Sequence, residues 1–350
     1  MREAIQKVAV GPDRGRDMSR EEARLAMQSI LSGNADEIQV AVLLIALRMK
    51  RESMSEFLGL FDAMSSSVNT KSVDIPELFC LADPFDGYVR TVTMTPFIPA
   101  VLAACGCSAL MHGVETVGPK HGVTANKVYQ MAGIDVGLST EAASDVITQH
   151  GWSYIDQSMY APGLYALADL RDRIVKRTAL TTLERLLMPL RANKTHFVLG
   201  YVHKAYPSIY AAVAMEAGYD TTLLLKGVEG GLAPALNKPL RQFFFEGELP
   251  EDVDQEKQLF ESAELFDAKT AAQSLDVSDD FNREAAVQTC LEVGLSVLGG
   301  EKCVARDSLC LAVGQILFSH QRSNSLAQSV ETVAKSLDDG SALAQFKMLI

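Results

Sequence analysis

The stretch at positions 111–122, MHGVETVGPKHG, combines residue types that can bind phosphate. It follows an apolar run that is typical of a buried strand, and it holds several small residues together with one lysine, Lys120. A turn of this composition exposes backbone N–H groups, which can surround a phosphate while the lysine supplies a point charge. The spacing matches neither a Walker A loop nor a dinucleotide fingerprint. An ordinary strand-to-helix connection therefore remains the alternative interpretation.

Residues 170–205 form a basic segment in an acidic protein. The segment holds eight Arg and Lys residues against Asp172 and Glu184, which gives a local charge of +6. Such an imbalance favours an anionic ligand, and a solvated helix face is the alternative. If the ligand is a nucleic acid, its phosphates are expected to meet Arg171, Arg173, Lys176, Arg177, Arg191 and Lys194.

The net charge of −12, from 32 basic and 44 acidic residues, does not exclude such ligands. An acidic total argues against a dedicated nucleic-acid coat, which normally carries a basic excess. However, residues 246–280 contain twelve acidic residues and two lysines, so this stretch alone carries −10 and the rest of the chain −2. The local distribution of charge is therefore the better guide to the ligand.

Neither a membrane nor a disulfide framework is indicated. No apolar run approaches the roughly 20 residues that cross a bilayer. The N-terminus lacks the apolar core of a signal peptide, so we expect a cytoplasmic protein with no membrane partner. The six cysteines lack the spacing of a zinc site and are expected to be reduced thiols.

Two kinds of pattern divide the chain. Residues 1–74 are predicted to be helical, and Ser19 and Glu22 have the spacing of a capping box. Beyond this unit, short apolar runs alternate with helix-length segments, which is typical of βαβ units. Residues 164–190 are predicted to be helical again and to complete the first unit. The fold class is therefore α/β: a small N-terminal all-helical domain (1–74) plus a larger α/β domain (75–350) with a mainly parallel central sheet flanked by helices.

Several segments together resemble the anthranilate phosphoribosyltransferase family, a glycosyl transferase family with the fold of the pyrimidine nucleoside phosphorylases. They include GRDMSREEARLAMQSILSGNADEIQVAVLLIALRMK, ACGCSALMHGVETVGPKHG and RIVKRTALTTLERLLMPLRAN. LGYVHKAY, LLLKGVEGG and SVETVAKSLDDGSALAQF extend the resemblance over nearly the whole chain. The resemblance implies a phosphorylated ribose ligand between the domains and a homodimer joined through the helical domain. The apolar run Val40–Leu47 is consistent with such a dimer, and an intramolecular core explains it equally well.

The resemblance also implies individual site residues. His112 and Gly113 match the family's His-Gly, and Lys120 matches the lysine of its Ser-Ser-Lys turn. Arg177 matches the arginine that faces the aromatic acceptor, and Asn193 keeps the asparagine of a later turn. The phosphate- or ligand-binding residues implied in this way are His112, Gly113, Gly118, Lys120, Gly122, Arg177 and Asn193.

Two departures from the family pattern concern the pyrophosphate donor. The family's Gly-Thr-Gly-Gly-Asp loop corresponds to residues 83–90, where Phe85 and Tyr88 add bulk. The family's Asp-Glu pair, which holds magnesium, corresponds to residues 232–234, which are Leu-Ala-Pro. Magnesium prefers carboxylates together with phosphate oxygens. We therefore predict no resident metal, with Glu229 as a weak candidate ligand, and Mg²⁺ only when phosphoribosyl pyrophosphate is bound.

These patterns leave two hypotheses about function. In the first, a phosphoribosyltransferase-like protein binds a ribose phosphate or a nucleotide between its domains, and the anthranilate reaction itself is not expected because its motifs are incomplete. In the second, the chain is a non-catalytic dimer that binds DNA or RNA in a basic groove around residues 170–205, as resemblance to a paralogous branch of the family implies. Nearby tyrosines could stack on bases, and half-buried packing is the alternative for them. No catalytic side chain is assigned.

Overall fold

The N-terminal unit is a helical bundle. A computed structural model describes residues 1–350 except 12–13, 248, 250–251, 262–264 and 267–281, so much of the acidic stretch 246–280 lies outside the described residues. The predicted capping box is confirmed, because the Ser19 hydroxyl accepts from the Glu22 N–H and the Glu22 carboxylate accepts from the Ser19 N–H. The helices of the bundle are α1 (Arg2–Val8), α2 (Arg20–Leu31), α3 (Glu37–Lys50) and α4 (Met54–Ser66).

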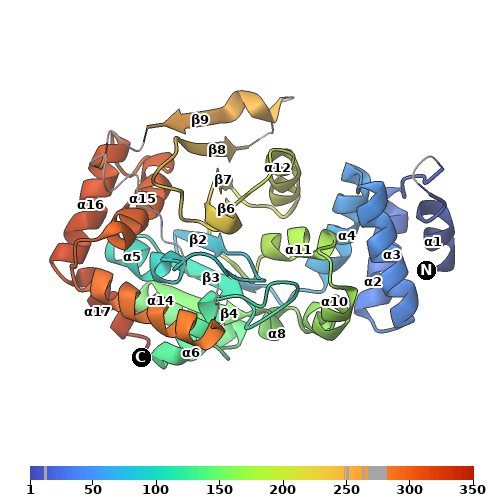
Figure 1. Ribbon diagram of the computed structural model, residues 1–350, viewed down its shortest axis with the longest axis horizontal. Helices are drawn as coiled ribbons and strands as arrows, with labels where there is room; N and C mark the ends of the chain where they lie inside the picture. The colour runs from blue at the N-terminus through green and yellow to red at the C-terminus, as the bar shows by residue number, and fades with distance from the viewer. Residues whose placement is uncertain (12–13, 248, 250–251, 262–264, 267–281) are drawn as a thin grey trace.

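A seven-stranded sheet forms the centre of the second unit, in the order β4-β3-β2-β6-β7-β8-β9 (Figure 1). The strands from β4 to β7 in this order are parallel, whereas β8 and β9 are antiparallel to their neighbours. The predicted mainly parallel sheet is thus confirmed. The strands are β1 (Lys71–Ser72), β2 (Glu77–Ala82), β3 (Ala109–Gly113), β4 (Trp152–Asp156), β5 (Leu190–Arg191), β6 (Lys194–Gly200), β7 (Thr221–Leu225), β8 (Leu240–Glu246) and β9 (Lys257–Phe260).

Helices cover both faces of the sheet, as predicted. The C-terminal helices and α5 lie on one side, and α11 and α12 lie on the side nearer the helical bundle (Figure 1). No helix of the described residues is both long enough and apolar enough to cross a membrane. The helices are α5 (Ile98–Ala104), α6 (Ala125–Ala132), α7 (Thr140–His150), α8 (Gln157–Tyr160), α9 (Pro162–Tyr165), α10 (Ala168–Ile174), α11 (Ala179–Leu183), α12 (Tyr206–Glu216), α14 (Arg283–Leu298), α15 (Val304–Ser319), α16 (Leu326–Asp338) and α17 (Ser341–Lys347), with short 3₁₀ turns at η1 (Thr95–Phe97), η2 (Glu184–Leu186), η3 (Val228–Gly230) and η4 (Val253–Glu256).

The strands bury side chains on both faces, because successive residues of a strand point in opposite directions. Along β2, Cys80 belongs to an apolar core that also contains Leu43 and Leu60 of the helical bundle. Its neighbours Phe79 and Leu81 belong to a second core beneath the C-terminal helices. The bundle and one face of the sheet therefore share a continuous apolar core.

The segment predicted to return to the first unit lies against it. Helices α10 and α11 contact α3, and α11 also contacts α4. The chain then continues through η2 and β5 to β6, in the middle of the sheet. Residues 164–190 therefore bridge the helical bundle and the carboxyl edge of the sheet, which is where a ligand site can form.

Candidate functional site

A cavity of about 910 Å³ lies between the helical bundle and the α/β domain. Its wall includes α3, the connection between α10 and α11, and the segments that follow the carboxyl ends of β2, β6 and β7. Ligands of parallel sheets commonly bind at the carboxyl ends of the strands. The cavity therefore occupies the position at which this fold favours a ligand.

Basic side chains dominate the charged residues of the cavity wall. Six basic residues line it against two acidic ones, although the chain as a whole is acidic. A wall with one prevailing sign of charge raises the local concentration of ligands of the opposite sign. The charged residues are Arg48, Arg90, Lys120, Lys176, Arg177, Arg185, Asp86 and Glu229.

Two of these cations are already paired with carboxylates. The Arg177 guanidinium donates through Nε to Asp86 Oδ2 at 3.0 Å, and its Nη2 also bonds this oxygen. The Lys120 ammonium donates to Glu229 Oε2 at 3.0 Å and to the Gly87 carbonyl at 2.8 Å. The two residues that the family resemblance singles out as cations therefore reach the cavity, but their charges are balanced within the protein.

Three other exposed basic side chains of the cavity wall are available to pair with a ligand. Arg48, Arg90 and Lys176 make no ion pair with any residue that the structure describes. Arg48 Nη1 lies 3.5 Å from the hydroxyl of Tyr206, an aromatic residue that also lines the cavity. An anion that enters the cavity can thus pair with these side chains without displacing a carboxylate.

The two loops that correspond to the family's donor site pack against each other. Tyr88 and Val123 exchange backbone hydrogen bonds of 2.9 and 2.8 Å. The Tyr88 side chain is buried, and its hydroxyl donates to Asp83 Oδ1 at 2.6 Å. Phe85 forms a small buried cluster with Val114 and Val117 of the glycine-rich loop. Phe85 therefore fills space between the loops, whereas the Tyr88 side chain turns towards Asp83 and Thr95.

Glu229 links the two loops through hydrogen bonds. Its carboxylate accepts from the backbone N–H of Arg90 at 2.9 Å and from that of Val89 at 3.3 Å, besides its bond to Lys120. The residue lies in η3, within the turn Gly227–Gly231, and its side chain is 11% exposed. Glu229 thus contacts hydrogen-bond donors from both loops.

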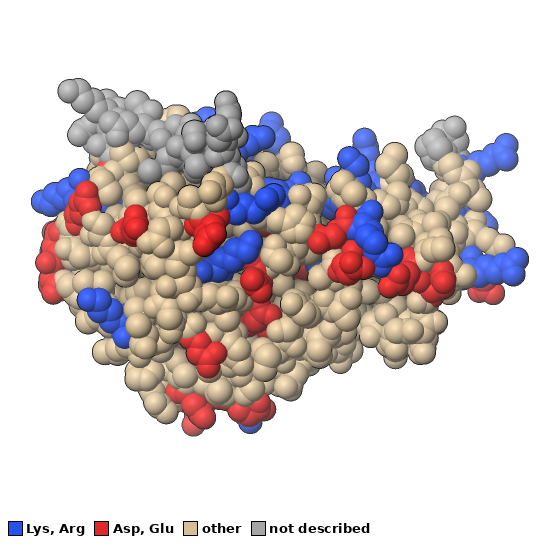
Figure 2. Space-filling view, turned by 60° about the horizontal axis from the view of Figure 1, so that its bottom comes forward, with Lys and Arg blue, Asp and Glu red and all other residues tan. Residues whose placement is uncertain are grey.

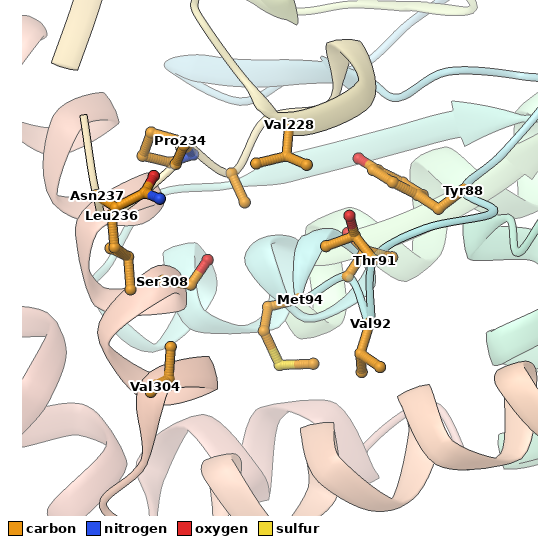
Figure 3. Close-up of a pocket in the computed structure, with 13 residues that line it drawn as sticks. Tyr88, Thr91, Val92, Met94, Val228, Pro234, Leu236, Asn237, Val304 and Ser308 are labelled. Atoms are coloured by element: carbon orange, nitrogen blue, oxygen red, sulfur yellow. The ribbon is translucent and has the colours of Figure 1, made fainter. Parts of the chain in front are cut away.

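The place of the family's acidic pair adjoins a second, small cavity of about 70 Å³ (Figure 3). Ala233 and Pro234 line it together with apolar neighbours such as Val228 and Met94. Among the residues that the structure describes, no three His, Cys, Asp or Glu side chains gather into a metal-binding group. Because magnesium requires oxygen ligands, commonly carboxylates, the residues present do not fit a magnesium–pyrophosphate complex at this place.

His112 is buried and does not line the cavity. It is 1% exposed, and its Nδ1 lies 3.0 Å from the Tyr160 hydroxyl. Phe85, which lines the cavity, packs against the imidazole in a T-shaped arrangement. Burial, together with the positive charge of Arg185, lowers the pKa of His112 to about 3. The imidazole is therefore neutral at pH 7 and supplies no charge to a phosphate.

The glycines of the phosphate loop have packing roles. A Cβ at Gly122 would lie 2.4 Å from the Tyr88 carbonyl oxygen, and one at Gly118 would lie 2.4 Å from Asp172 Oδ1. Gly113 is buried at the end of β3. The N–H of Gly122 donates to the Asp86 carbonyl at 2.9 Å, so it is not free for a phosphate. Gly122 thus permits the two loops to approach each other, whereas Gly118 lies against Asp172 of α10.

Asn193 lies away from the cavity, contrary to what the resemblance implies. It is exposed on the turn between β5 and β6, and Arg191 at the end of β5 and Lys194 at the start of β6 are exposed beside it, whereas the cavity adjoins the other end of β6. The Arg191 guanidinium donates to the Ala217 carbonyl at 3.2 Å. A strand of this length separates its two ends by about 20 Å, so these side chains do not share a site with Lys120.

The six basic residues that the sequence suggests for nucleic-acid binding do not form one groove. Only Lys176 and Arg177 line the cavity. Arg171 is buried, and its guanidinium makes two hydrogen bonds of 2.6 Å to Glu184. Arg173 pairs with Glu37 at 2.8 Å on the surface. On the face shown in Figure 2, basic and acidic side chains are interspersed. This distribution does not favour a continuous path for a polyanion.

The structure adds Arg48 and Arg185 to the candidate site. Arg185 is 6% exposed, and its Nη2 donates to the carbonyls of Ala82, Gly200 and Gly230 at 3.2, 3.1 and 3.0 Å. It therefore places a buried positive charge at the carboxyl ends of β2 and β6. Its position in RIVKRTALTTLERLLMPLRAN, one of the segments that resemble the family, was the available sequence signal. Arg48, in the last turn of a helix, is also explained by the helix dipole.

A helical bundle, a parallel α/β domain and a basic cavity between them define a two-domain protein of the glycosyl transferase type. Two family descriptions match the chain: the helical bundle domain of a glycosyl transferase family over residues 2–68, and its α/β domain over residues 87–343. The chain belongs to this family, which includes the anthranilate phosphoribosyltransferases that its sequence resembles.

Similar proteins cover nearly the whole length of the chain. A protein from Aquifex aeolicus described as uncharacterized is 28% identical over 92% of this chain and 94% of its own. Anthranilate phosphoribosyltransferase from Methanopyrus kandleri is 23% identical over 96% of each chain. The crystal structure of anthranilate phosphoribosyltransferase from Thermus thermophilus superposes with a TM-score of 0.76 at 19% identity, covering 99% of this chain and 98% of that one. Anthranilate phosphoribosyltransferase from Saccharomyces cerevisiae, in complex with phosphoribosyl pyrophosphate (PRPP) and Mg, superposes with a TM-score of 0.75 at 15% identity. The superposition covers 99% of this chain and 96% of that one.

Proposed function

We propose that the protein is phosphoribosyltransferase-like and binds a ribose phosphate or a nucleotide in the 910 Å³ cavity. The observation that carries this proposal is the excess of basic side chains at the carboxyl edge of the sheet in an otherwise acidic protein. Arg48 on the bundle and Lys176 on the α10–α11 connection are suited to pair with a phosphate. Tyr206 and Tyr210, which also line the cavity, offer aromatic surface for a base.

The ordinary reaction with anthranilate is not part of this proposal. Transfer from phosphoribosyl pyrophosphate needs stabilisation of the departing pyrophosphate, which magnesium normally supplies. Ala233 and Pro234 cannot ligate magnesium, and the loops that would hold the donor are packed together through Phe85 and Tyr88. We therefore expect no phosphoribosyl transfer to anthranilate when donor and Mg²⁺ are supplied.

Titration calorimetry with adenosine 5′-monophosphate and ribose 5-phosphate tests the binding function. We expect saturable binding to the wild-type protein, and about tenfold weaker binding after Arg48→Gln or Lys176→Gln, because each removes a charged hydrogen-bond donor. Arg173→Gln is the control, since Arg173 is a surface cation outside the cavity wall. Absence of binding to the wild type, or equal loss in the control, would contradict the proposal.

We also propose that the protein forms a homodimer through the outer face of α3. Val40, Leu43 and Leu47 of the apolar run are buried inside the chain and are not available for a partner. The neighbouring residues Ile38 and Val42 are 74% and 43% exposed, and they lie one turn apart on the same helix face. A second copy that presents the same face would bury these apolar side chains.

A further inference from the structure

The carboxylate of Glu229 lies in a ready-made anion site. Its oxygens receive hydrogen bonds from two consecutive backbone N–H groups, Val89 and Arg90, and from the ammonium of Lys120. Consecutive N–H groups beside a lysine are the elements with which proteins bind phosphate oxygens. Both loops that correspond to the family's donor site thus direct their donors at a side chain of the protein itself.

The backbone around Glu229 is strained in a way that supports a role for its carboxylate. Glu229 has a φ of 51°, in the left-handed region, while Gly227, Gly230 and Gly231 surround it in the same turn. A non-glycine residue costs about 1 kcal/mol or more in that region. A fourth glycine would relieve this strain, so packing of the turn does not by itself explain a glutamate at this position.

Neighbouring contacts hold the turn in place. The Arg185 guanidinium donates to the Gly230 carbonyl at 3.0 Å, and a Cβ at Gly231 would lie 1.5 Å from the Tyr88 hydroxyl oxygen. Tyr88 belongs to the loop that presents the two N–H groups, and the adjacent Gly87 carbonyl accepts from Lys120 at 2.8 Å. The carboxylate, its donors and its supporting turn therefore form one interlocked unit.

We propose that Glu229 acts as an internal substitute for a phosphate, so that its carboxylate occupies an anion subsite and excludes pyrophosphate-bearing donors from it. The inference rests on the proposed function, because it assigns the adjoining cavity near Arg48 and Lys176 to the phosphorylated ligand. An entering pyrophosphate has to displace a carboxylate that is 11% exposed and would leave it without Lys120. Removal of the carboxylate exposes the subsite.

Binding of inorganic pyrophosphate by calorimetry tests this inference. Glu229→Gly suits the positive φ and frees the three donors, so we expect this variant to bind pyrophosphate about 10- to 100-fold more tightly than the wild type. In Glu229→Gln, which keeps the shape but removes the charge, we expect a smaller gain. A second substitution, Lys120→Met, is expected to abolish most of the gain, because pyrophosphate in the subsite would contact that ammonium.

Glu115→Gln is the matched control. Glu115 is an exposed acidic residue of the same glycine-rich loop, so its substitution removes an equal charge without opening the subsite. Equal pyrophosphate affinity of the wild type and both Glu229 variants, including no binding to any of them, would overturn the inference. An equal gain in Glu115→Gln would also overturn it. Binding of adenosine 5′-monophosphate to the wild type is measured separately, so failure of the proposed function is distinguishable from failure of this inference.

Discussion

Burial of His112 as a neutral imidazole makes the stability of the protein dependent on pH. Burial lowers the pKa of His112 to about 3, whereas histidine in an unfolded chain titrates near about 6.5. As the pH falls below 6.5, the unfolded chain takes up a proton that the folded protein does not accept. The contribution of His112 to stability is therefore fully present above pH 6.5, and it is lost progressively as the pH falls from there towards 3.

The size of this loss follows from proton linkage. Between pH 7 and pH 5, uptake of the proton by the unfolded chain lowers the free energy of unfolding by about 2 kcal/mol. Replacement by glutamine removes the titrating group while it keeps a polar side chain near the Tyr160 hydroxyl. We expect His112→Gln to lose about 2 kcal/mol less than the wild type over this pH range. His320, whose pKa burial lowers to about 4, is present in both proteins, and its effect cancels in the difference.

Urea unfolding followed by the fluorescence of Trp152 measures this difference. Trp152 is the only tryptophan, and it lies on β4 in register with Ala109 of β3, the strand that carries His112. Tyr160→Phe is the control, because it removes the hydrogen bond to the imidazole but no group that titrates in this range. The control is expected to be about 1 kcal/mol less stable with an unchanged pH slope. Equal pH slopes in wild type and His112→Gln would refute the reasoning.

Three further substitutions test the packing and the assembly. Gly122→Ala would place a Cβ 2.4 Å from the Tyr88 carbonyl oxygen, so we expect about 1–3 kcal/mol of destabilisation and a lower midpoint of thermal unfolding; an unchanged midpoint would show that the loops are not held together as described. Arg171→Met leaves the buried Glu184 carboxylate without its bidentate partner, which is expected to cost about 3–5 kcal/mol in urea unfolding, and adding Glu184→Gln should recover part of it. Ile38→Glu places a charge on the exposed face of α3, and light scattering is expected to give the monomer mass for this variant and the dimer mass for the wild type; equal masses would contradict the proposed interface.

Local sequence signals were sufficient for much of the fold. The Ser19 capping box and the alternation of apolar runs with helix-length segments depend on neighbouring residues, and both are confirmed. The antiparallel strands β8 and β9 were not predicted. The direction of a strand depends on its connection: β7 reaches β8 through residues 226–239 without a crossover helix, which permits antiparallel pairing.

The candidate site was predicted only in part, because its charges are balanced over long sequence distances. Lys120 and Arg177 line the cavity, but their partners Glu229 and Asp86 are 109 and 91 residues away in the chain. No local pattern reveals such pairs. Asn193 shows that a local match can also mislead: it belongs to a matching segment, yet the length of β6 separates it from the cavity.

The apolar core that the bundle shares with the sheet limits how the cavity can change its width. Leu43 and Leu60 of the bundle pack in the same core as Cys80 and Phe197 of the sheet. Pulling the two units straight apart would expose this core to water, at a free-energy cost of about 25 cal/mol for each Å² of apolar surface. A rotation about the core leaves most of it covered. The admission of larger ligands is therefore expected to proceed by hinge rotation of the bundle about the shared core.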